Sequence, residues 1–270
     1  MIHPMYKIHP SQMNSFRKPS RRNFLKRTSL IGASVLAAPV YTDQFPFSEE
    51  QKGGGTYRFL FKGDSITDGN RSRDMDWNHV LGHGYVYLIA ADLLYRFPSK
   101  NFQFFNRGVS GNQITDLSQR WSADTIALKP DLVSILIGEN DTMNAVNGNT
   151  NATASAYEIA FRALLKETKQ QLPEAELVIC EPFILPVGRV KEHLDNYRRE
   201  ISERQEAARK IAVEFQAIYI PLQNLFIQAA EKYPHDNYWL WDGIHTMPNG
   251  HELMAREWIK QVGKKIQFVS

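Results

Sequence analysis

Residues 57–69 read YRFLFKGDSITDG, and this stretch decides the fold. Its first half alternates aromatic and aliphatic side chains with polar ones, which is typical of a short strand that enters a sheet. Its second half is rich in glycine, aspartate, serine and threonine, which favours a turn. A serine at the end of a buried strand is held rigidly at the edge of the sheet. Ser65 is therefore either a nucleophile or the cap of a following helix.

Apolar strand candidates alternate with helical patterns over the rest of the chain. The predicted strands cover residues 57–62, 102–106, 131–137, 175–181 and 217–221. Helical patterns lie near residues 80–96, 113–128, 154–171, 194–215, 222–232 and 248–262. Because the strands are apolar nearly throughout, they predict a parallel sheet with helices on both faces. The expected fold class is α/β: a flavodoxin-like, three-layer α/β/α sandwich with about five parallel strands.

Four polar, glycine-rich segments follow the predicted strands. Three come directly after the first, second and third strands, and the fourth comes after the last strand and helix: residues 63–65, 106–112, 138–141 and 241–245. In an open α/β sheet, functional residues gather in the loops after the carboxyl ends of the strands. We therefore expect the four segments to meet at one edge of the sheet.

An aspartate three residues before a histidine can orient the imidazole that deprotonates a serine. The chain contains this pair twice, at Asp76/His79 and at Asp242/His245. The first pair lies too near Ser65 in the sequence to have its own strand end, and we interpret it as loop and helix-start residues. The second pair follows a turn and precedes a predicted helix, which favours it as the orienting acid and the base.

Four short motifs together resemble the sequence blocks of the SGNH (GDSL) hydrolase family. They are GDSITDG at 63–69, VSGNQ at 109–113, GENDT at 138–142 and DGIH at 242–245. They occur in the family's order and at compatible spacing, within a region from about residue 57 to 262. The one departure is Ile66, where the family name has leucine, and this aliphatic exchange should affect packing only. The resemblance implies a flavodoxin-like fold and a serine esterase mechanism.

The same resemblance implies a role for each motif residue. Ser65 would be the nucleophile and His245 the general base, with Asp242 as the partner of the histidine. The backbone N–H groups of Ser65 and Gly111 and the side-chain amide of Asn140 would form the oxyanion hole.

Other motifs in the sequence lead to no metal or cofactor. G-x-S-x-G is absent, which excludes the nucleophile elbow of the α/β-hydrolases. His251-Glu252 lacks the second histidine of a zinc-protease motif. His79 and His83 have helical spacing, but they have no acidic or cysteine companion that suggests a metal. The single cysteine, Cys180, lies in an apolar run and is predicted to be a small core residue.

The positive charge of the chain is concentrated in its first 37 residues. They contain no acidic residue and seven basic ones, namely Lys7, Arg17, Lys18, Arg21, Arg22, Lys26 and Arg27. Because the whole chain has a net charge of +3, removing these seven charges leaves about −4 for the remainder. The basic balance therefore does not indicate a nucleic-acid partner.

This N-terminal region is organised like an export signal. Residues 20–26, SRRNFLK, precede an apolar run and small residues, and they resemble the twin-arginine export signal of bacteria. The alternative is an ordinary basic amphipathic helix. The apolar run is too short for a membrane anchor. We expect a signal peptide over 1–37 with cleavage after Ala37, a linker over 38–55 and a catalytic domain over 56–270. The expected location is periplasmic or secreted, reached in the folded state through the twin-arginine export machinery.

Three tryptophans give the only sequence indication of the substrate. Trp77 lies just past the predicted nucleophile, and Trp239 and Trp241 flank Asp242. Aromatic faces near an esterase cleft can stack on sugar rings, so within the family the chain looks most like the carbohydrate acetylesterases; otherwise the tryptophans are loop anchors and core residues. The expected substrate is a small acyl ester, acetyl in the first place, on carbohydrate. The alternatives are a lysophospholipase or thioesterase of the same family and a non-catalytic carbohydrate-binding relative.

Overall fold

The computed structural model describes residues 55–266, with the exception of residues 75 and 77. The predicted signal peptide, nearly all of the predicted linker and Trp77 lie outside the described residues. Within the described range, no helix combines the length and the apolar character that a membrane span requires.

A five-stranded parallel sheet lies at the centre of the fold, with the strand order β2-β1-β3-β4-β5. The strands are β1 (Tyr57–Gly63), β2 (Phe102–Gly108), β3 (Leu132–Leu136), β4 (Glu176–Cys180) and β5 (Ile218–Ile220). This is the flavodoxin-like order, in which the chain reverses direction across the sheet between β1 and β3. The structure confirms the predicted α/β fold class.

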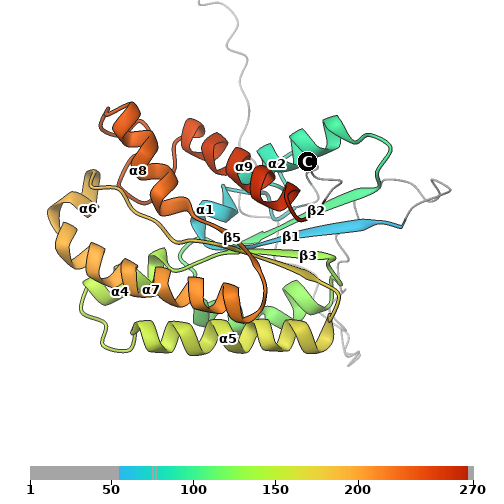
Figure 1. Ribbon diagram of the computed structural model, residues 1–270, viewed down its shortest axis with the longest axis horizontal. Coiled ribbons are helices and arrows are strands. Elements are labelled where there is room, and N and C mark those ends of the chain that lie inside the picture. The colour runs from blue at the N-terminus through green and yellow to red at the C-terminus, as the bar shows by residue number, and fades with distance from the viewer. Residues whose placement is uncertain (1–54, 75, 77, 267–270) are drawn as a thin grey trace, which may run out of the picture. The chain divides into compact units, whose positions relative to one another are not determined.

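Helices cover both faces of the sheet and complete the three layers (Figure 1). One face carries α2 (Tyr85–Arg96), α8 (Leu222–Lys232) and α9 (Pro248–Gly263). The other carries α3 (Ile114–Gln119), the π-helix η1 (Ser122–Ile126), α5 (Ala154–Gln171) and α7 (Leu194–Glu214). Successive side chains of β1 alternate between the two cores: Phe59 and Phe61 lie in the first, and Leu60 lies in the second.

The predicted helices differ from the observed ones in two places. The helix expected from residue 80 begins only at Tyr85, because Gly82 has a φ of +75°, which a helix does not allow. The helix expected over 113–128 divides into α3 and η1. Three short helices were not predicted, namely α1 (Ser65–Asp68), α4 (Glu139–Val146) and α6 (Gly188–Glu192). Helices α1 and α4 begin within the polar segments 63–65 and 138–141, whereas α6 lies between β4 and α7.

A buried histidine links helix α9 to the start of helix α2. His251 is 8% exposed, and its Nδ1 accepts a hydrogen bond of 3.2 Å from the backbone N–H of Tyr85. The ring therefore carries its proton on Nε2, which lies 2.8 Å from Oγ1 of Thr246. Burial, together with the neighbouring His83 and His245, lowers the pKa of His251 from 6.5 to about 4.

We predict that protonation of His251 destabilises the fold between about pH 6.5 and pH 4. Because the folded-state pKa is lower than the unfolded one, the stabilisation is present above pH 6.5 and is lost as the pH falls towards 4. The loss at low pH should reach about 3 kcal/mol. Urea unfolding of wild type and His251→Gln across this range should show a shallower acid loss in the variant. Replacement of the exposed His235 by glutamine is the control, and equal slopes in all three proteins would contradict the prediction.

Candidate active site

The turn after β1 places Ser65 at the carboxyl edge of the sheet. Helix α1 begins at Ser65, and its N-cap is Asp64, whose Oδ1 accepts a hydrogen bond of 3.0 Å from the backbone N–H of Ile66. Ser65 is therefore not the cap of this helix, and its hydroxyl is free for another partner. Asp64 is buried, whereas Ser65 is partly exposed.

The hydroxyl of Ser65 is joined to a histidine and an aspartate from the far end of the chain. Oγ of Ser65 lies 2.9 Å from Nε2 of His245, and Nδ1 of the same ring lies 2.9 Å from Oδ2 of Asp242. Oδ1 of Asp242 accepts the backbone N–H groups of Ile244 and His245 at 3.0 and 2.7 Å. The structure thus brings together the three residues that the sequence analysis assigned to a catalytic triad.

These contacts determine the charge on Asp242. Burial alone would raise its pKa, but the hydrogen bonds from the His245 ring and from the backbone of His245 and Ile244 lower the pKa to about 2. Asp242 is therefore an anion at neutral pH. An anion in this position holds the proton of His245 on Nδ1 and leaves Nε2 as the acceptor that faces Ser65.

The two other residues predicted to supply donors for an oxyanion follow β2 and β3: Gly111 lies in the loop after β2, and Asn140 is the second residue of α4. Gly111 has a φ of +83°, which a side chain would strain, and no atom lies within 4 Å of the place where a Cβ would stand. The side-chain nitrogen of Asn140 donates to Oδ2 of Asp64 at 3.2 Å and to the backbone oxygen of Asn112 at 3.1 Å. Asn140 is thus tied both to the residue before Ser65 and to the residue after Gly111.

Buried carboxyl groups lie directly below this part of the site. Asp64, Glu139 and Asp141 are each at most 5% exposed. Burial raises the pKa of Asp64 to about 7 and that of Asp141 to about 6, and it raises the pKa of Glu139 well above its usual value. Oε2 of Glu139 has no hydrogen-bond partner, which is consistent with a protonated, uncharged acid.

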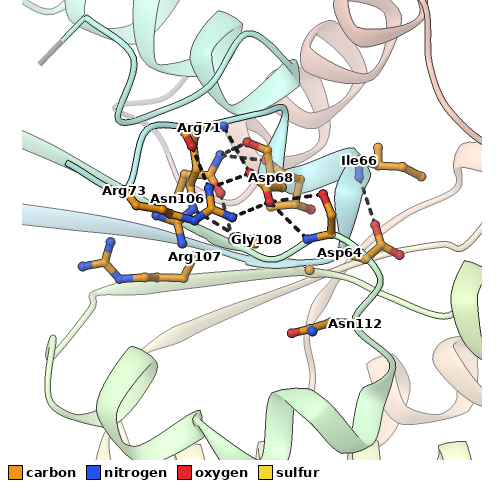
Figure 2. A network of polar contacts seen from close by, with 12 residues as sticks. Asp64, Ile66, Asp68, Arg71, Arg73, Asn106, Arg107, Gly108 and Asn112 are labelled. Atoms are coloured by element: carbon orange, nitrogen blue, oxygen red, sulfur yellow. Dashed lines mark hydrogen bonds and ion pairs between the residues drawn. The ribbon is translucent and has the colours of Figure 1, made fainter. Parts of the chain in front are cut away.

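A network around Asp68 fastens the loop after β2 to helix α1 (Figure 2). The carboxylate of Asp68 accepts two hydrogen bonds from the guanidinium of Arg73, at 2.9 and 2.6 Å, and one from the backbone N–H of Ser110 at 3.1 Å. Asn106 bridges the same elements, because its amide donates to the backbone oxygen of Thr67 at 2.7 Å. A Cβ on Gly108 would lie 2.2 Å from the backbone nitrogen of Asp68, so only glycine allows this approach.

Arg120 holds the other side of the same loop, and the sequence analysis did not identify it. Its Nε and Nη2 donate to Oδ1 of Asn112 at 3.0 and 2.8 Å, and its Nη1 donates to the backbone oxygen of Arg107 at 2.8 Å. Its position is set by Asp124, whose Oδ2 is also 3.3 Å from the fully buried Nζ of Lys62. The loop that carries Gly111 is therefore clamped from both sides.

The three tryptophans have different surroundings. Trp241 is 51% exposed, and its ring stacks on the imidazole of His245 with 5.6 Å between the ring centroids. Trp239 packs against the core on the face of α2, α8 and α9, as expected of a structural residue. Trp77 lies outside the described residues. Of Trp239 and Trp241, it is Trp241 that contacts the triad.

The second Asp-x-x-His pair forms a contact of its own at the surface. Nδ1 of His79 lies 2.5 Å from Oδ2 of Asp76, and both side chains are exposed. This pair belongs to the loop between α1 and α2, as the first part of its interpretation predicted, but neither residue starts a helix, because α2 begins only at Tyr85. In the described part of the chain, no group of three or more histidine, cysteine or acidic side chains has the arrangement of a metal site.

Comparison with known families agrees with the motifs and the fold. The model of the GDSL-like lipase/acylhydrolase family matches residues 61–253. The chain belongs to this family, as the four sequence blocks predicted.

Two relatives are similar to the chain over about three quarters of its length. An acetylxylan esterase from Geobacillus stearothermophilus is 31% identical over 219 residues, which are 78% of this chain and 96% of that protein. Its crystal structure has a TM-score of 0.66 at 30% identity and covers 77% of this chain and 94% of the other. A putative GDSL-like lipase from Parabacteroides merdae has a TM-score of 0.73 at 38% identity, with 77% and 95% coverage. The family and these relatives support an esterase activity for the chain.

Proposed function

We propose that the chain is a serine esterase that removes small acyl groups, acetyl in the first place, from carbohydrate. The observation that carries the proposal is the hydrogen-bonded series Ser65–His245–Asp242 at the carboxyl edge of the sheet, with both side-chain contacts at 2.9 Å. The bond between nucleophile and base and the bond between base and orienting acid are the geometry that activates a serine.

In this proposal, Oγ of Ser65 attacks the carbonyl carbon of the ester while Nε2 of His245 takes the hydroxyl proton. Asp242 stabilises the imidazolium that forms. The tetrahedral intermediate then collapses, the bond to the alcohol breaks, and His245 returns the proton to the leaving oxygen. Water enters, gives a proton to His245, and attacks the acyl-serine. The bond from the acyl carbon to Oγ then breaks, the acid leaves, and His245 returns the proton to Oγ of Ser65.

The backbone N–H groups of Ser65 and Gly111 and the amide of Asn140 supply the donors for the oxyanion. The two hydrogens of the Asn140 amide are engaged by Asp64 and Asn112 in this structure, so its bond to an oxyanion would replace one of these internal bonds. Donors of this kind are each worth about 10²- to 10³-fold in rate.

The choice of substrate rests on the relatives and on Trp241. The Geobacillus relative is an acetylxylan esterase, and solved structures of it include catalytic mutants with alanine in place of a serine, an aspartate or a histidine. The aspartate and histidine of that enzyme are three positions apart, as Asp242 and His245 are. The exposed part of Trp241 offers an apolar surface for a sugar ring beside His245.

Replacing Ser65 with alanine tests the mechanism. The variant should lose hydrolysis of p-nitrophenyl acetate by about 10³-fold or more, because no acyl-enzyme can form. Its thermal unfolding should match that of wild type, because within residues 55–266 as described the hydroxyl hydrogen-bonds only to His245. Ser118→Ala, on helix α3, is the matched control. Retention of full turnover in Ser65→Ala would end the proposed mechanism.

The acyl preference tests the substrate class. We expect the value of kcat/KM to be highest for acetyl esters and to fall with chain length from p-nitrophenyl acetate to the laurate. We also expect release of acetate from acetylated xylan, followed enzymatically. A preference for long acyl chains would contradict this proposal and favour a lysophospholipase or thioesterase. Binding of xylan without hydrolysis of any ester would favour a non-catalytic carbohydrate-binding relative.

We also propose that the chain is exported in the folded state, on the basis of its first 37 residues alone. Replacing Arg21 and Arg22 with lysine should leave the protein full-length and inside the cell, because the twin-arginine pair is the recognised feature of such signals. Cell fractionation and mass spectrometry of the N-terminus are the measurements. Equal export of wild type and variant would contradict this part of the proposal.

A further inference from the structure

Helix α6, which the sequence analysis did not predict, places an arginine on the acid of the triad. Nη2 of Arg189 lies 2.6 Å from Oδ2 of Asp242, the same oxygen that lies 2.9 Å from Nδ1 of His245. Asp242 is 5% exposed and Arg189 is 43% exposed, so the pair stands at the boundary between the site and solvent. One carboxylate oxygen is thus shared by an imidazole and a guanidinium.

Close packing of the backbone holds α6 in this place. A Cβ on Gly188 would lie 2.5 Å from Cα of Asp242, and one on Gly243 would lie 2.6 Å from the backbone oxygen of Val187. The backbone N–H of Leu185 donates to the oxygen of Gly243 at 3.0 Å. The start of α6 is therefore packed against the turn that carries Asp242. Arg189 is the residue directly after Gly188, so this packing places its side chain beside Asp242.

Trp241 completes the surroundings of this contact. The guanidinium carbon of Arg189 lies 6.0 Å from the centroid of the Trp241 ring, and the same ring stacks on His245. A weak contact of 3.7 Å between Nη1 of Arg189 and the sulfur of Met143 lies on the side of α4. Arg189 therefore has a defined position, in spite of its exposed fraction.

We propose that Arg189 is a positioning residue that keeps Asp242 in line with His245 and holds the imidazole in its uncharged, proton-accepting form down to lower pH. The proposal rests on the function proposed above. The guanidinium offsets the charge of Asp242 and repels a proton on the ring, and both effects disfavour the imidazolium. A triad with this arginine should therefore stay active under more acidic conditions than one without it.

Other titratable groups also lie around His245, and substitution of Arg189 does not remove them. Asp64, in the turn after β1, attracts a positive charge on His245, and His251, on α9, repels one when both rings are protonated. Tyr197, on α7, lies near both Arg189 and Asp242. A change that follows substitution of Arg189 alone can therefore be assigned to the guanidinium.

The test compares wild type with Arg189→Gln. In the variant, the acid limb of kcat/KM for p-nitrophenyl acetate should move to higher pH by about half a unit to one unit. Activity on that limb should be about three- to tenfold lower than in wild type, and the difference should be smaller on the alkaline plateau. The ring carbon resonances of His245, followed by NMR against pH without substrate, should show the same displacement.

Two further variants complete the design. Arg189→Lys keeps the positive charge and should restore most of the wild-type profile, whereas Arg199→Gln removes an exposed arginine elsewhere and should leave the profile unchanged. Coincident acid limbs and coincident NMR titrations in wild type and Arg189→Gln would overturn the proposal, and so would an equal loss at every pH. Since the NMR titration needs no turnover, it decides the role of Arg189 even if Ser65→Ala shows that the proposed mechanism is wrong.

Discussion

The parallel pairing of β1 with both of its neighbours is the constraint on which the site depends. Gly63, the last residue of β1, pairs with Gly108 of β2 on one side and with Leu136 of β3 on the other. The three strands therefore end at the same level, and the loops that follow them leave the sheet together. A shift of register by one residue would turn the side chains of β1 to the opposite face and separate Ser65 from the loops that serve it.

Much of the fold and the triad could be predicted from the sequence, because their signals are local. An apolar run such as that around Leu132 can be buried only in a covered sheet, so the strands and the α/β class follow from the pattern. The order of four polar loops then selects Ser65, Asp242 and His245 from the other residues of the same types. The pair Asp76/His79 has the same spacing, and it was set apart because it has no strand end of its own, whereas Asp242/His245 follows a turn and precedes a predicted helix.

The supporting residues could not be predicted, because their residue types are common and their contacts form only when the chain is folded. Arg189 and Arg120 are ordinary arginines in the sequence, and their roles depend on Asp242 and Asn112, which they meet only in the folded chain. The glycine at 188 gave no signal either, since the backbone that it approaches lies more than fifty residues further along. The roles of such residues depend on which side chains and backbone atoms the fold brings next to them.

The carboxylate of Asp124 connects the interior of the molecule to the site. One of its oxygens contacts both the buried Lys62 of β1 and Arg120, which holds the loop of Gly111. Burial lowers the pKa of Lys62 more than Asp124 raises it, and the resulting pKa is about 7. The consequence is a coupling of core and site: a substitution at Asp124 would leave a buried lysine without its counter-charge and remove an ion pair from Arg120 at the same time. The stability of the core and the placement of the Gly111 loop therefore depend on the same carboxylate.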